Sequence, residues 1–117
     1  MTNLSRHQRP APVAKCAPVL TAAVEGPDAH DHALSVLHLF PEVYHDATRS
    51  QADRMVADAE KLLADKYVAV RLAASRALVQ MGSTASIPVL RSVIATEPLP
   101  WARVTLQQDL ETFEKLQ

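Results

Sequence analysis

Residues 65–78 read DKYVAVRLAASRAL, and residues 97–110, 32 positions further along, read EPLPWARVTLQQDL. An acidic residue opens both segments, an arginine follows six positions later in both, and Leu78 corresponds to Leu110. A repeat with a period of about 20–50 residues is typical of solenoid proteins, in which stacked units bury one continuous core. Because the apolar residues of both segments recur at helical spacing, the repeat predicts a short α-solenoid.

The composition fits a single all-α domain. The chain has 117 residues, of which 48% are hydrophobic and only 4% aromatic, so we expect an aliphatic core. Two glycines in the whole chain argue against a β-sandwich and against a glycine-rich phosphate loop. The net charge of −1 argues against a nucleic-acid partner, because phosphate contacts need clustered lysine and arginine.

The single cysteine and the hydropathy pattern bear on location. Cys16 has no second cysteine with which to form an internal disulfide, which fits a reducing compartment. No apolar run reaches the roughly 18 residues that a spanning helix requires. Lys15 and Pro18 interrupt the apolar stretch at 13–24, which therefore lacks the core of a secretory signal. These features predict a cytoplasmic protein with no membrane partner.

The first 27 residues differ from the rest of the chain. They hold four of the eight prolines and three basic residues against one acidic residue. Because proline removes a backbone donor and biases the preceding residue away from helix, we expect residues 1–27 to form a proline-rich flexible arm. A docking segment that orders on binding is the alternative. Residues 28–117 then form the helical domain.

Five helices are expected in that domain. The first runs from a cap at Asp28 and stops before Pro41, and Gly82 ends the third in the left-handed conformation. The third helix begins with Asp65 as its cap. The expected ranges are 28–40, 48–64, 65–81, from Ser83 or Thr84 to the prolines at 98 and 100, and 101–116. The second helix is expected to begin near Thr48 or Ser50. The apolar faces include Leu34 on the first helix, Tyr67 on the third, and Met55, Ala59, Leu62 and Leu63 on the second.

The faces of the third and fifth helices differ in a way that suggests a repeat array with a capped end. The third helix has two apolar faces and leaves only a narrow strip of Ala69, Ala73, Arg76 and Gln80. On the fifth helix the second face is mostly polar, as a terminal repeat requires for solubility. Asp109 departs from this pattern by falling where the third helix has a core alanine. We expect Asp109 to lie at an edge or to pair with Arg103 or Arg76.

The motif that carries the repeat is shared with a known family. It consists of Asp65, Val70, Arg71, Ala74, Ala77, Leu78, Met81, Gly82, Ile87, Pro88 and Leu90. This pattern resembles the HEAT repeat, in particular the short bacterial HEAT-like repeat of the phycobilisome-lyase type, over about residues 48–116. The resemblance implies a solenoid of about two repeats plus an N-terminal helix, with structural roles for Asp65 and Arg71. It also implies protein binding along the second helix of each hairpin.

That surface corresponds to the narrow strip and to its counterpart on the fifth helix. The predicted partner-binding residues are Arg76, Gln80, Trp101, Thr105 and Gln108. Trp101 replaces the small Ala69 of the first copy, and exposed tryptophan and arginine are over-represented among binding hot spots. The alternative is that Trp101 packs against the turn between Pro98 and Pro100 and closes the end of the core.

Histidines are the other notable feature, because His30, His32, His38 and His45 lie close together beside acidic residues. Imidazole and carboxylate are good metal ligands, but His30 and His32 are two positions apart and point to opposite sides of a helix. An exposed polar face is the simpler interpretation, so we predict no metal and no cofactor. No nucleophile motif or phosphate loop is present, and we predict no catalysis.

The sequence thus predicts a non-catalytic protein-interaction module or small adaptor. The alternative is a metal- or tetrapyrrole-binding accessory protein that uses the histidine-rich first helix. Because that helix covers the N-terminal end only in part, we also expect a protein partner or self-association there. A free-standing bundle, with the first helix between both hairpins, is a third interpretation, and a DNA-binding solenoid is disfavoured by charge.

Overall fold

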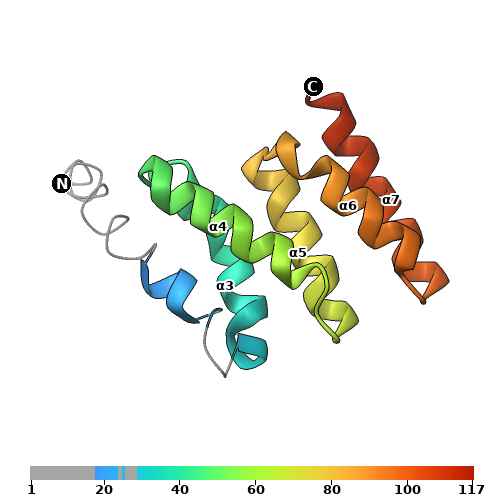
Figure 1. Cartoon of the computed structure of the whole chain (residues 1–117), viewed down its shortest axis with the longest axis horizontal. Helices are drawn as coiled ribbons and strands as arrows, with labels where there is room; N and C mark the ends of the chain where they lie inside the picture. The colour runs from blue at the N-terminus through green and yellow to red at the C-terminus, as the bar shows by residue number, and fades with distance from the viewer. Residues whose placement is uncertain (1–17, 24, 26–28) are drawn as a thin grey trace, which may run out of the picture.

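The computed structural model of the chain describes residues 18–23, 25 and 29–117, with side chains from residue 32 onward in the last of these ranges. Every regular element in this part of the chain is helical, which confirms the predicted all-α class. In Figure 1 the two helices that come first in the list below overlap toward one end of the molecule, and the last helix lies at the other end. The elements from residue 29 onward are α3 (Ala29–Tyr44), α4 (Arg49–Leu62), α5 (Val68–Met81), the 3₁₀ turn η1 (Thr84–Ser86), α6 (Ile87–Thr96) and α7 (Pro100–Lys115).

The helices pack as consecutive antiparallel hairpins. Helix α4 packs against α5, and α6 packs against α7. Across the hairpins, α5 contacts both α3 and α7, so α5 lies between these two helices. Helix α3 therefore stacks on the first hairpin, which differs from a bundle with α3 between both hairpins.

A single aliphatic core runs through these contacts. Phe40 of α3 and Phe113 of α7 are its largest fully buried side chains. Burial of each such side chain contributes about 1.5–3 kcal/mol. The apolar stripe predicted for α4 is confirmed, because Met55, Ala59, Leu62 and Leu63 are all buried. Two predicted core residues are wrong: Leu34 is 50% exposed and Tyr67 is 52% exposed.

Helix α4 begins at a capping box with Thr48 as its N-cap, one of the two starts that the sequence predicted. The Gln51 amide donates to the Thr48 hydroxyl at 3.2 Å, and the Thr48 amide donates to the Gln51 side chain at 3.1 Å. Two backbone donors that the helix cannot satisfy are thereby satisfied.

Helix α5 ends at Gly82 as predicted. Gly82 has φ of 72° and ψ of 27°, the left-handed conformation, and the Ser83 amide donates to the Leu78 carbonyl at 3.2 Å. This closes the helix with a Schellman motif. The predicted start of α5 is wrong, because Tyr67 rather than Asp65 is the N-cap. The Asp65 carboxylate instead accepts from the Tyr67 amide at 2.9 Å and so shapes the turn before the helix.

Helix α3 continues through Pro41 to Tyr44, so the predicted stop before Pro41 is wrong. Proline costs the helix one backbone hydrogen bond at this position. Val43 and Tyr44, which follow it, pack against the core and offset that loss. The predicted cap at Asp28 lies outside the described residues.

Part of the expected arm also differs from the prediction of an extended segment. Residues 18–23 are helical, Thr21 is buried, and Leu20 and Ala23 pack against the core. The Thr21 hydroxyl donates to the Pro18 carbonyl at 3.1 Å, and a proline is tolerated in the first turn of a helix. The gain from burying Leu20 and Ala23 explains why proline content misled here. Residues 1–17 lie outside the described residues.

The second hairpin begins with a short 3₁₀ turn that the sequence did not predict. The 3₁₀ turn η1 precedes α6, and Ser83 makes no side-chain capping bond to it. Pro88 lies in the first turn of α6, and Pro100 opens α7, positions at which the missing amide costs little. Both prolines therefore mark helix starts.

Candidate functional site

The five residues predicted to bind a partner belong to α5 and α7, two helices that pack against each other. Arg76, Gln80, Trp101 and Gln108 are exposed, and Thr105 is half-buried. The Thr105 hydroxyl donates to the Trp101 carbonyl at 3.2 Å within α7 and is thus already satisfied. The strip consists of Ala69, Ala73, Arg76 and Gln80 on α5 and of Trp101, Thr105, Gln108 and Thr112 on α7.

Trp101 has the largest side chain of the strip. It is 56% exposed and does not belong to the core. The core-facing side of α7 is filled instead by Ala102, Leu106 and Phe113, each of which is fully buried. The interpretation in which Trp101 closes the end of the core is therefore wrong.

A buried polar cluster lies beneath the strip and joins its two helices. Asp109 of α7 is only 3% exposed, and its carboxylate accepts a hydrogen bond of 2.7 Å from the Ser75 hydroxyl. Arg76 forms an ion pair with the other oxygen of Asp109, with 3.5 Å between Nη2 and Oδ1. The expected pairing of Asp109 with Arg76 is confirmed, whereas Ser75 was missed. Ser75 could have been found from the sequence, because it is a polar residue on the second face of α5, which is otherwise apolar.

A groove between α3 and α5 adjoins the strip, and the sequence did not indicate it. The α3–α5 groove has a volume of about 160 Å³. Its lining consists of Leu34, Leu37, His38, Ala73, Arg76, Ala77 and Gln80. Leu34 had been assigned to the core, although it lies at the edge of the apolar arc of its helix. The groove extends the candidate surface from two helices to three.

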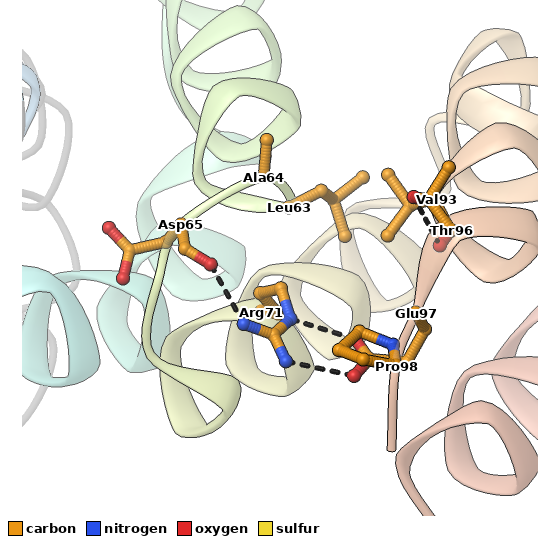
Figure 2. A pocket seen from close by; sticks show the side chains of 8 residues that line it. All are labelled: Leu63, Ala64, Asp65, Arg71, Val93, Thr96, Glu97 and Pro98. Atoms are coloured by element: carbon orange, nitrogen blue, oxygen red, sulfur yellow. Dashed lines mark hydrogen bonds and ion pairs between the residues drawn. The ribbon is translucent and has the colours of Figure 1, made fainter. Parts of the chain in front are cut away.

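Another polar contact joins the two hairpins and lies at the edge of a second pocket. Arg71 of α5 donates from Nε and Nη2 to the two oxygens of Glu97, at 2.7 Å and 2.8 Å. Its Nη1 donates to the carbonyls of Asp65 and Lys66 at 2.9 Å and 3.1 Å. Figure 2 shows Arg71 between the Asp65 turn and Glu97, at a pocket of about 240 Å³.

The electrostatics of this pair follow from its burial and geometry. The Glu97 side chain is fully buried, and that of Arg71 is 12% exposed. The hydrogen bonds from Arg71 lower the pKa of Glu97, and the bonds to Glu97 raise the pKa of Arg71. Every nitrogen of the guanidinium already has an acceptor within the chain. The pocket therefore holds a structural ion pair and presents no free charge to a ligand.

A third group of charges connects the segment at 18–25 to α4. Arg54 donates to both oxygens of Glu25, and the bond from its Nε is 2.8 Å long. This pairing lowers the pKa of Glu25 to about 2. Asp58 lies one turn further along α4 and is 6% exposed, and burial, together with the neighbouring Glu25, raises its pKa to about 7. Among the described residues, no group donates to Asp58 Oδ2.

The described histidines His32, His38 and His45 are exposed. In the described part of the chain, no three histidine, cysteine, aspartate or glutamate side chains gather where they could hold a metal ion. The side chains of His30 and Asp31 lie outside that part. None of the described helices combines the length and apolar character needed to cross a membrane.

Comparisons of this chain with models of known protein families, with curated proteins and with solved structures find no match. The likeness to HEAT repeats therefore stays a prediction, based on the motif at residues 65–90 and its partial recurrence. The candidate surface rests on the geometry of α3, α5 and α7 alone.

Proposed function

We propose that this chain is a non-catalytic protein-interaction module, or small adaptor, that binds a partner protein through the strip. The observation that carries the proposal is the exposure of Trp101, at 56%, on α7, the helix that packs against α5 with its exposed Arg76. Tryptophan and arginine are the residue types most enriched among interface hot spots.

The arrangement of charges supports the same conclusion. Arg71 and Glu97 satisfy each other inside the fold and are structural. Arg76 differs, because it makes one ion pair of 3.5 Å and its side chain is 61% exposed. It therefore has donors available for a partner at the surface.

The test compares two exposed apolar residues of α7. Trp101 is 56% exposed and lies on the strip, whereas Val104 is 58% exposed and lies outside it. Tagged wild-type chain, Trp101→Ala and Val104→Ala would be used to capture proteins from the native host, with quantification by mass spectrometry. We expect a partner that is lost with Trp101→Ala and retained with Val104→Ala. If every captured protein responds equally to the two variants, the strip is not the binding surface.

Two further expectations belong to this proposal. We place the protein in the cytoplasm, on the basis of its single cysteine. We also expect self-association or a protein contact at the N-terminal end, where Leu34 is half exposed. Native mass spectrometry of wild-type chain and Leu34→Asp would detect a dimer and its loss. A metal or tetrapyrrole on the histidine-rich helix stays the alternative, and metal analysis with an absorption scan of the purified protein tests it.

A further inference from the structure

The α3–α5 groove has a shape that suits a single aliphatic side chain. Its volume of about 160 Å³ equals on the order of five water molecules. Leu37 and Ala77 are buried beneath it. Leu34 and Ala73 line its sides and remain accessible, Leu34 being 50% exposed. An apolar group placed in the groove would remove the exposed leucine from water.

The charge of the groove is one-sided. Its ionisable lining residues are Arg76 and His38, and no carboxylate is among them. Lysine is also absent from the lining, so Arg76, which is 61% exposed and paired on one side with Asp109, is the cation at its polar edge. A carboxylate approaching this edge would be attracted, whereas an ammonium group would be repelled.

Arg76 is held in place and still able to bind. Its ion pair with Asp109 is 3.5 Å long, and no other described side chain accepts a bond from it. Asp109 is itself fixed by the 2.7 Å hydrogen bond from Ser75. A guanidinium carries five donors in a planar fork, so a second carboxylate can bind to it.

We propose that the α3–α5 groove binds a segment of a partner protein in which an aliphatic side chain stands next to an aspartate or glutamate. The aliphatic side chain inserts between Leu34 and Ala73, and the neighbouring carboxylate pairs with Arg76. This inference rests on the proposed function and adds the chemistry of the bound segment. Trp101 contacts the same partner further along the strip.

The experiment uses 12-residue peptides displayed on phage and selected against the intact chain. Enriched peptides are then synthesised and their affinities are measured by fluorescence polarisation. We expect an aliphatic residue beside an acidic one in the enriched set. Replacement of that acidic residue by lysine should weaken binding about tenfold or more, as should Arg76→Gln, because a charge-assisted bond is lost.

Matched variants separate the groove from the rest of the fold. Ala73→Leu fills the groove, and Ala95→Leu adds the same atoms at an exposed position of α6. Arg103→Gln, on the exposed side of α7, is the control for Arg76→Gln. We expect Ala73→Leu to weaken binding about tenfold and both controls to leave it within about twofold. Circular dichroism verifies that each variant is folded.

The outcomes distinguish the two proposals. Peptides that bind, lose affinity with Trp101→Ala and show no preference for an acidic neighbour would overturn the groove assignment and leave the interaction function in place. Binding that is unchanged by Ala73→Leu and Arg76→Gln would also overturn it. If no peptide is enriched, the groove assignment is wrong, and the capture experiment with Trp101→Ala then decides the broader function.

Discussion

Loss of the Glu97 carboxylate should destabilise the protein far more than loss of an exposed carboxylate. In Glu97→Ala, Arg71 loses the acceptors of its Nε and Nη2 while its side chain stays only 12% exposed. Removal of one partner from a buried ion pair costs about 3–5 kcal/mol. The adjoining pocket of about 240 Å³ admits water to the vacated space, so we expect a value near the lower limit, about 3 kcal/mol. That change lowers the ratio of folded to unfolded protein by more than about a hundredfold.

The measurement is urea unfolding followed by far-UV circular dichroism, which reports directly on helix content. Glu114→Ala is the matched control, because Glu114 pairs with Arg91 at the surface, where the two side chains are 40% and 55% exposed. An exposed pair contributes at most about 1 kcal/mol. The double variant Arg71→Met with Glu97→Leu removes both charges and should recover most of the lost stability. If Glu97→Ala and Glu114→Ala cost the same, or the double variant is no better than the single one, the reasoning is refuted.

Two other predictions concern Asp58 and Gly82. Because its pKa is raised to about 7, Asp58 holds its proton more tightly in the folded state, so the free energy of unfolding falls as pH rises from about 4 to 7. The pKa of Glu25 is lowered to about 2, so the stability from this group is complete above about pH 4.5 and is lost only as pH falls further. Urea titrations at several pH values should show that Asp58→Asn makes this decrease in the free energy of unfolding smaller by roughly 1–2 kcal/mol, after allowance for solvent screening. An unchanged pH profile of the variant contradicts this. Gly82→Ala should lower the free energy of unfolding by about 1–2 kcal/mol, because alanine disfavours the positive φ of this position. No atom lies near the added methyl group, so a steric clash contributes nothing, and Gly82→Asn should lower the melting temperature less than Gly82→Ala does. Equal melting temperatures for the two variants would argue against a backbone cause.

Helix ends in this chain follow from the sequence wherever one residue fixes the local backbone by itself. Thr48 and Gly82 were predictable because a capping oxygen and a left-handed glycine act within one turn. Pro41 and the segment at 18–23 were not, because their conformations depend on packing against residues distant in sequence. Proline content indicates only the local loss of helix hydrogen bonding, and it contains no information on the stabilisation from packing against the core.

The candidate surface was likewise predictable only in part. The predicted repeat placed Arg76 and Trp101 on two helices expected to stack, and these helices, α5 and α7, pack against each other. It could not show that Leu34 leaves the core, since this depends on how α3 is rotated against α5. The pairing of Arg71 with Glu97 was also missed, because the two residues are 26 positions apart and belong to different units.

The pairing of Arg71 with Glu97 bears on how a further copy of the predicted repeat could be added. Glu97 opens the second copy of the predicted repeat and binds Arg71 of the first, so this ion pair ties the two copies together. Arg103 stands where Arg71 stands in the first unit, is exposed, and forms no ion pair with a described carboxylate. A third unit that begins with an acidic residue and is fused after α7 would therefore find a binding partner already present. An extension of the predicted repeat would also require an apolar outer face on α7.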